Sequence, residues 1–121
     1  MKIYVSGPMT GLPKLNYPAF FDAETKLIEM GFKVSNPAQY PPVIGAQWED
    51  YLRRDIKDLM DCDGLALLPG WTDSRGACLE RDIAERLFMP IYPLVYWLNN
   101  TINRVETWNS YAEKRKHRAG L

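Results

Sequence analysis

The sequence predicts an α/β fold, in which a parallel β-sheet lies between two layers of helices. Short runs of β-branched and aromatic residues alternate along the chain with longer segments whose apolar residues recur at helical spacing. One short run, DGLALL at 63–68, is almost entirely apolar, which is typical of a strand covered on both faces. At 121 residues the chain has the length of one domain, so we expect residues 1–121 to form a single domain.

The first half of the chain begins with a strand and a helix. A strand is expected at residues 2–6 (KIYVS), because Gly7 and Pro8 interrupt the run of β-formers. Residues 17–30 repeat apolar side chains at helical spacing, and Gly31 is expected to end this helix as a C′ glycine.

The alternation continues after a second short strand at 32–35. Residues 36–47 carry three prolines and a glycine and are expected to form an irregular loop before a helix at 48–60. The remaining elements are expected to be a strand at 63–68, a loop at 69–74, a helix at 75–88, a strand at 90–94 and a closing helix at 101–116. Because strands separated by helices imply right-handed crossovers, we predict a three-layer sandwich with a doubly wound parallel sheet of four to five strands, flavodoxin-like or Rossmann-like.

Charge and composition argue against several classes of partner. The chain has 15 Lys and Arg and 15 Asp and Glu, so we expect no nucleic-acid partner, and the basic run at 114–118 is interpreted as a solvated helix end. Cys62 and Cys78 are expected to be free thiols, and with His117 as the one histidine we predict no metal and no cofactor. We find neither a signal peptide nor an apolar run near the roughly 20 residues that span a membrane, and we therefore expect a cytoplasmic protein.

Two acidic residues fall in the middle of apolar helical stripes. At about 100° per residue, Asp55 lies within the stripe of 48–60 and Glu80 within that of 75–88. Burying an unpaired carboxylate is costly, so two of them beside one apolar strand indicate a shared polar pocket. Alternatively, each acid pairs with an arginine at a helix or subunit contact.

Two loops at the expected ligand-binding edge of the sheet have a composition suited to an anion. SGPMTG at 6–11 lets the backbone approach a ligand, and SRG at 74–76 opens a helix whose first amides are unsatisfied. Alternatively, Ser74 is only the N-cap of that helix. The first loop lacks the GxGxxG fingerprint, so a nicotinamide dinucleotide is not expected.

Three motifs carry a resemblance to a known superfamily. They are IYVSGPMTG at 3–11, an aspartate eight residues before the acid that opens the third strand, and S-x-G-x-x-x-E at 74–80. With these motifs the chain resembles the nucleoside 2-deoxyribosyltransferase-like superfamily over about residues 1–93. Within it the chain is most similar to an uncharacterised phage and bacterial branch, and it also resembles the 2′-deoxynucleoside 5′-monophosphate N-glycosidases.

The resemblance implies roles for three catalytic residues. Glu80 would be the carboxylate nucleophile, Asp55 the aspartate that serves the leaving base, and Tyr4 the tyrosine that orients Glu80 by a hydrogen bond. Asp63 competes with Asp55, but it begins its strand, whereas sites lie beyond the other end. The residues expected to bind substrate are Ser6, Gly7, Pro8, Ser74, Gly76 and Asp63.

The resemblance also implies a substrate class. Enzymes that act on free nucleosides have an aspartate where this chain has Ser74, and a serine at a helix N-terminus can donate to a phosphate that an aspartate would repel. We therefore expect cleavage or base transfer at the N-glycosidic bond of a (deoxy)nucleoside 5′-monophosphate. Cleavage of another N-ribosyl compound, such as a dinucleotide, and non-catalytic nucleotide binding by a sensor module remain open alternatives.

Self-association is the last expectation. An apolar segment near the sheet edge contains more apolar surface than one small domain readily buries, which favours a homodimer or higher homo-oligomer. The superfamily completes its site across a dimer contact, which agrees with this expectation. The residues concerned are Ile91, Tyr92, Leu94, Val95, Tyr96 and Trp97.

Overall fold

A computed structural model describes residues 1–99 of the chain. Its sheet has four strands, all parallel, in the order β2-β1-β3-β4. The strands are β1 (Lys2–Ser6), β2 (Lys33–Ser35), β3 (Gly64–Leu67) and β4 (Ile91–Pro93). All four were expected from the sequence, and the predicted α/β fold with a doubly wound parallel sheet is confirmed.

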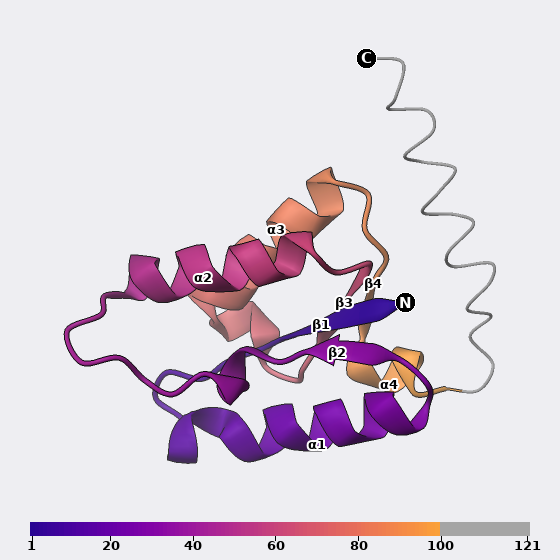
Figure 1. The fold of residues 1–121 in the computed structure, drawn as a ribbon, viewed down its shortest axis with the longest axis horizontal. Helices are drawn as coiled ribbons and strands as arrows, with labels where there is room; N and C mark the ends of the chain where they lie inside the picture. The colour runs from indigo at the N-terminus through magenta and orange to yellow at the C-terminus, as the bar shows by residue number, and fades with distance from the viewer. Residues whose placement is uncertain (100–121) are drawn as a thin grey trace.

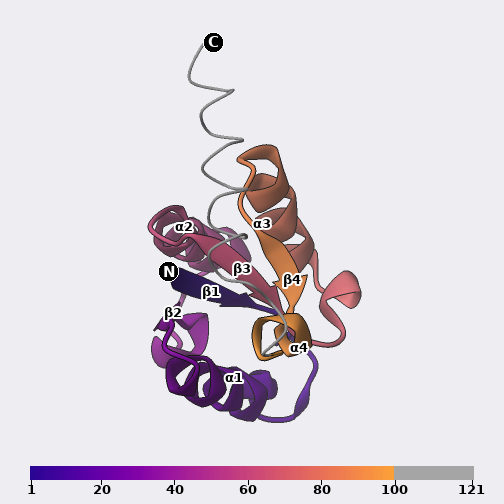
Figure 2. The ribbon, with the colours of Figure 1, turned by 90° about the vertical axis from the view of Figure 1, so that its right-hand side faces the viewer.

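Helices cover both faces of this sheet (Figure 1, Figure 2). One face carries α1 and α4, and the other carries α2 and α3. The helices are α1 (Tyr17–Glu29), α2 (Trp48–Met60), α3 (Arg75–Arg86) and α4 (Leu94–Trp97), and three short 3-10 turns are η1 (Pro13–Asn16), η2 (Pro37–Gln39) and η3 (Trp71–Asp73). The closing helix expected at 101–116 and the basic run at 114–118 lie outside the described residues.

The ends of the helices follow from local sequence signals. Gly31, at φ 94°, ends α1 in a Schellman motif, in which its N–H donates to the carbonyl of Ile28 and that of Phe32 donates to Leu27. A capping box of Gln47 and Asp50 begins α2. These signals fix the end of α1 and the start of α2, and therefore which of their side chains reach the sheet.

Alternation along the strands divides the core into two clusters. Ile3 and Val5 of β1 pack with α1 and α4, whereas Tyr4 faces α2 and α3 on the other side. All four residues of β3 are buried, as expected for a strand covered on both faces. The side of β1 that faces α3 therefore presents a hydroxyl at Tyr4 and, two residues later, at Ser6.

The expectation that Trp97 belongs to an exposed apolar segment is wrong, because its side chain is buried. It is 1% exposed, its indole N–H donates to the Leu65 carbonyl at 2.9 Å, and its ring fills the space above Gly64. A Cβ at position 64 would lie 2.9 Å from that ring, so the missing side chain makes room for the tryptophan.

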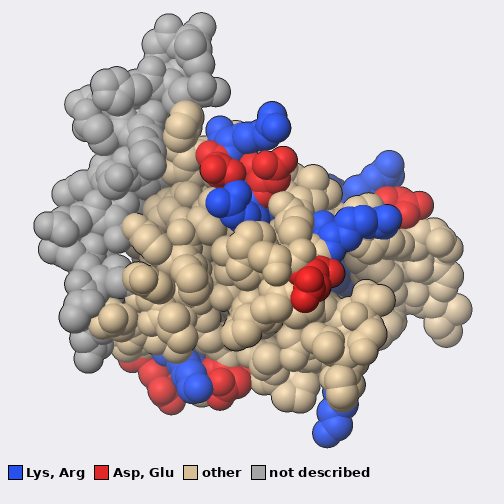
Figure 3. Space-filling view, turned by 180° about the vertical axis from the view of Figure 1, so that it is seen from behind, with Lys and Arg blue, Asp and Glu red and all other residues tan. Residues whose placement is uncertain are grey.

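Two neighbours of Trp97 are exposed, as the sequence analysis expects. Val95 and Tyr96 of α4 are 68% and 53% exposed. The view from behind, toward the β4 edge of the sheet, shows an area without charged side chains, bordered above, on the right and below by clusters of Lys, Arg, Asp and Glu (Figure 3). Among the described residues, no helix is long and apolar enough to cross a membrane.

Candidate active site

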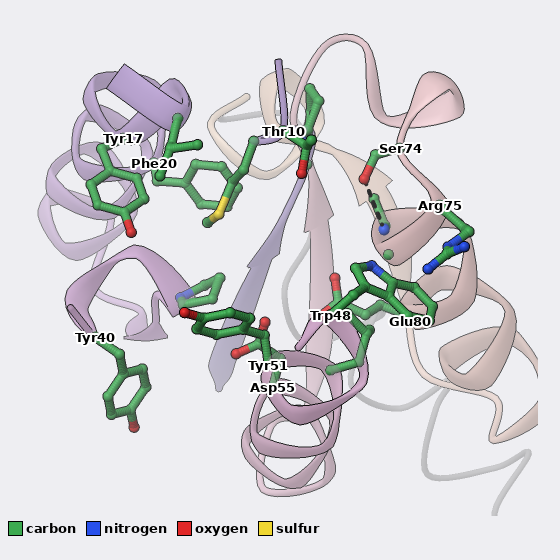
Figure 4. A pocket seen from close by; sticks show the side chains of 18 of the residues that line it. Thr10, Tyr17, Phe20, Tyr40, Trp48, Tyr51, Asp55, Ser74, Arg75 and Glu80 are labelled. Carbon is green, nitrogen blue, oxygen red and sulfur yellow. Dashed lines mark hydrogen bonds between the residues drawn. The ribbon is translucent and has the colours of Figure 1, made fainter. Parts of the chain in front are cut away.

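A pocket of about 660 Å³ opens beyond the carboxyl ends of β1 and β3, where ligands bind in doubly wound sheets (Figure 4). Its walls come from the loop after β1, the first turns of α1, the connection between β2 and α2, the inner side of α2 and the N-terminal turns of α3. Of the residues predicted from the sequence, the pocket is lined by Glu80, Asp55, Gly7, Pro8, Ser74 and Gly76.

Glu80 is the most deeply buried acid in the described part of the chain, at 5% exposure. The Tyr4 hydroxyl lies 2.5 Å from its Oε2, and the Ser6 hydroxyl donates to its Oε1 at 2.7 Å. Both hydroxyls come from the same face of β1, two residues apart, so the strand's alternation places one on each carboxylate oxygen. The hydrogen bond expected from Tyr4 to Glu80 is therefore present.

The pKa of Glu80 is set by opposing effects. Burial raises it, the hydrogen bonds from Tyr4 and Ser6 lower it, and the nearby charge of Asp55 raises it, so that the pKa is about 7. Burial and the neighbouring Glu80 charge also raise the pKa of the Tyr4 hydroxyl well above its ordinary value. Tyr4 therefore stays protonated as a donor at neutral pH, where Glu80 is partly ionised.

Asp55 reaches the pocket from α2, with 14% of its side chain exposed. Its Oδ1 accepts hydrogen bonds from Nε and Nη2 of Arg54, at 3.1 and 3.0 Å. Burial raises the pKa of Asp55, while the charge and hydrogen bonds of Arg54 oppose that rise. The sequence analysis left open that Asp55 pairs with an arginine at a helix or subunit contact. Asp55 does pair with an arginine, but this ion pair lies in the pocket wall.

The two loops expected to meet an anion border the same pocket. Gly7 lies directly against Leu68, where a Cβ would be 2.7 Å from the leucine Cβ, so glycine is required for this close approach. Ser74 is the N-cap of α3, and its hydroxyl oxygen accepts the Ala77 N–H at 3.1 Å. Capping uses the oxygen of Ser74 as an acceptor, which leaves its O–H able to donate into the pocket.

Three predicted site residues do not line the pocket. Tyr4 and Ser6 lie on β1 and donate hydrogen bonds to Glu80. Asp63 is not brought to the site, because it lies at the amino end of β3, where its carboxylate accepts the Lys2 N–H at 2.9 Å. The structure therefore favours Asp55 over Asp63 as the second carboxylate.

Several pocket residues were not identified from the sequence. Arg75 stacks on the Trp48 ring, with 3.5 Å between its guanidinium carbon and the ring centroid. Tyr40, Tyr51 and Arg54 form part of the opposite wall. The sequence pattern places Trp48 and Tyr51 only in an apolar stripe and Tyr40 only in an irregular loop. Periodicity cannot show that a stripe borders a cavity instead of the core.

The arrangement combines a buried, partly ionised carboxylate with a second carboxylate in one polar pocket. Glu80 can attack or stabilise a cationic carbon, because two hydroxyls fix its orientation and burial excludes water from it. Asp55 can bind or exchange a proton with a second part of the ligand. Among residues 1–99, no group of three His, Cys, Asp or Glu side chains could hold a metal ion.

Comparisons with known proteins agree with this architecture. The family model described as Domain of unknown function (DUF4406) matches residues 1–93. No curated protein is detectably similar in sequence. A solved structure of a 2-deoxyribosyltransferase from the psychrotolerant bacterium Bacillus psychrosaccharolyticus is similar with a TM-score of 0.61 and 20% identity, over 91% of this chain and 82% of that chain. At this identity the likeness shows a shared fold, and the chain belongs to the DUF4406 family.

Proposed function

We propose that this protein breaks the N-glycosidic bond of a nucleoside 5′-monophosphate and passes the sugar phosphate to water or to a second base. The observation that carries the proposal is the Glu80 carboxylate, buried beside the pocket and held through both oxygens by Tyr4 and Ser6. The fold shared with a 2-deoxyribosyltransferase supports it.

The chemistry of the bond explains why a fixed carboxylate is needed. C1′ of the sugar leaves its base through an oxocarbenium-like transition state, whose positive charge an adjacent carboxylate stabilises or captures covalently. In the covalent version, a Glu80 oxygen forms a bond to C1′ as the bond from C1′ to the base nitrogen breaks and its electron pair leaves with the base. Water or a second base then forms a bond to C1′ as the bond from C1′ to the Glu80 oxygen breaks. Glu80 recovers its carboxylate, and the proton that the attacking group loses passes to Asp55, which has given one to the departing base.

Asp55 is proposed to meet the leaving base. A base nitrogen leaves more readily when its developing negative charge is met by a proton or a hydrogen bond. Asp55 lines the same pocket as Glu80, and the two are close enough for the charge of Asp55 to raise the pKa of Glu80. The two carboxylates can therefore act on the two sides of one bond.

The phosphate is proposed to bind at the N-terminus of α3. Ser74 can donate from its hydroxyl, the first amides of the helix point outward, and Gly7 and Pro8 border the same space. Arg75 lines this part of the pocket and stacks on Trp48, so its positive charge adds to the attraction.

Base release tests the proposal. Purified protein is incubated with each of the common ribo- and deoxyribonucleoside 5′-monophosphates, and free base is separated by chromatography. We expect free base together with the sugar 5-phosphate, or, when a second base is added, a new nucleotide. Binding of monophosphates without any base release would contradict catalysis and favour a nucleotide sensor.

A further inference from the structure

Arg54 and Asp55 are consecutive residues of α2, yet their side chains form an ion pair in the pocket wall. Arg54 donates through Nε and Nη2 to the same oxygen, Oδ1 of Asp55. Side chains of adjacent helical residues point about 100° apart and do not ordinarily face each other. The Arg54 side chain therefore folds back along the helix toward Asp55, and only 30% of it is exposed.

Two tyrosine rings hold the Arg54 guanidinium in this position. Its central carbon lies 4.5 Å from the ring centroid of Tyr40 and 5.4 Å from that of Tyr51. The Tyr51 hydroxyl accepts the Val43 N–H at 3.0 Å and donates to the Val43 carbonyl at 3.1 Å, which fixes the ring. Asp58 lies close enough to raise the pKa of the Tyr40 hydroxyl. The guanidinium is thus in contact with two aromatic rings before any ligand binds.

The two carboxylate oxygens of Asp55 differ in their hydrogen-bond partners. Oδ1 receives both Arg54 hydrogen bonds, whereas no group among residues 1–99 forms a hydrogen bond with Oδ2. Asp55 lines the pocket, so Oδ2 is the oxygen left for a ligand.

The charges around Asp55 make Arg54 the favourable partner. Arg54 and Asp58 face Asp55 from α2, Tyr40 from the connection before that helix, Tyr4 from β1 and Glu80 from α3. In this set, Arg54 alone is a cation. Its charge lowers the pKa of Asp55 against the effects of burial and of Asp58.

We propose that Arg54 is a positioning residue for Asp55: it holds the carboxylate through Oδ1 and leaves Oδ2 as the oxygen that meets the base of the substrate. The identity of the group at Oδ2 rests on the proposed function, whereas the pairing of Arg54 with Asp55 does not. Arg54 thereby orients the second carboxylate and opposes the rise that burial causes in its pKa.

The ionisation of Asp55 is measured without substrate turnover, by carbon-13 NMR of the aspartate carboxyl groups in the free protein as a function of pH. Asp55→Asn assigns the resonance. Arg54→Gln is expected to raise the pKa of Asp55 by about one unit, a tenfold change in its protonation equilibrium, because partial exposure places the effect at the low end of the range for a neighbouring opposite charge. Arg53→Gln is the matched control, since Arg53 is an exposed neighbour on the same helix, and it should leave the pKa unchanged.

Kinetics distinguish a positioning role of Arg54 from a purely structural role. In Arg54→Gln, the limb of the kcat/KM profile that belongs to Asp55 is expected to move by the same amount as its NMR pKa. Arg54→Lys keeps the charge and should restore most of the pKa, but not kcat, because an ammonium cannot reproduce the two donors of the guanidinium fork. A merely structural role would lower activity without moving the profile.

The outcomes distinguish the two proposals. An Asp55 pKa that is the same in Arg54→Gln and Arg53→Gln would overturn the role of Arg54, even if the wild-type protein releases base. A wild-type protein that releases no base would overturn the proposed function, while a raised Asp55 pKa in Arg54→Gln would still support the pairing on which the role of Arg54 depends.

Discussion

The hydroxyl of Tyr4 lies 2.5 Å from Oε2 of Glu80, across the contact between β1 and α3. It donates to a carboxylate that burial disfavours in its charged form, so the hydrogen bond and the burial act on the pKa of Glu80 in opposite directions. The strand therefore supports the ionised state that a nucleophile needs.

Tyr4→Phe tests whether the Tyr4 hydrogen bond opposes the effect of burial on the pKa of Glu80. Loss of the hydrogen bond is expected to raise the pKa of Glu80 further, by about one unit, because hydrogen bonds to charged groups contribute roughly 1.5 to 3 kcal/mol and Ser6 remains to compensate in part. Since the reaction needs ionised Glu80, the acid limb of kcat/KM should move to higher pH. Tyr92→Phe, on a tyrosine outside the pocket, serves as the control. An acid limb at the same pH in both variants would show that Tyr4 does not tune Glu80.

The stability of the protein should depend on pH through the same carboxylate. The pKa of Glu80 is raised from 4.5 to about 7, so between these values the folded state binds the proton more tightly than the unfolded chain. The free energy of unfolding contributed by Glu80 therefore falls as pH rises through this window, by up to about 3 kcal/mol. Glu80→Gln should lack this fall and be more stable than wild type above about pH 7.

Urea unfolding at several pH values measures this difference. Glu85→Gln is the control, because Glu85 is an exposed glutamate on the same helix. Parallel stability curves for wild type and Glu80→Gln would mean that Glu80 is not buried as an acid with a raised pKa.

Ser74→Asp tests the phosphate site. Aspartate is as good an N-cap as serine, so α3 should be retained, but its charge would repel a phosphate and offer an acceptor to a 5′ hydroxyl. We expect the wild type to prefer a monophosphate over the matching nucleoside by about 1.5 to 3 kcal/mol for each charge-assisted contact, and the variant to reverse this preference. Calorimetry with both ligands gives the comparison, with Thr72→Asp as a charge control outside the pocket wall. Equal affinity of the wild type for the two ligands would contradict the phosphate site.

Self-association is predicted through the β4 edge of the sheet. Val95 and Tyr96 of α4, the helix that directly follows β4, are exposed, and the view toward this edge shows an uncharged area (Figure 3). Light scattering should give a dimer or higher oligomer for the wild type, and Val95→Asp should shift it toward the monomer. Ile44→Asp is the control, because Ile44 is fully exposed in the connection between β2 and α2. A wild-type monomer at micromolar concentration would argue against this interface.

The elements and the two carboxylates could be predicted because their signals are local. The apolar stripe and its start at Trp48 give α2 its observed bounds, and the same stripe brings Asp55 to the pocket. The place of Asp63 follows from the rule that sites lie beyond the carboxyl ends of strands.

The remaining features depend on tertiary contacts that periodicity does not encode. Trp97 is buried because Gly64, distant in sequence, leaves space for its ring. Ser6 reaches Glu80 and not the pocket because of the direction in which β1 presents its alternate side chains. The fold of the Arg54 side chain back onto Asp55 depends on two tyrosine rings, one of them outside α2.

Base release by Glu80→Gln, measured beside wild type and Glu85→Gln, tests the central claim most directly. The amide keeps the shape of the side chain but can neither capture nor stabilise a cationic C1′. With a monophosphate that the wild type cleaves, we expect Glu80→Gln to release no base above the uncatalysed rate, while it still binds the monophosphate and Glu85→Gln retains wild-type activity. Base release by Glu80→Gln at the wild-type rate would remove Glu80 from the reaction and contradict the account.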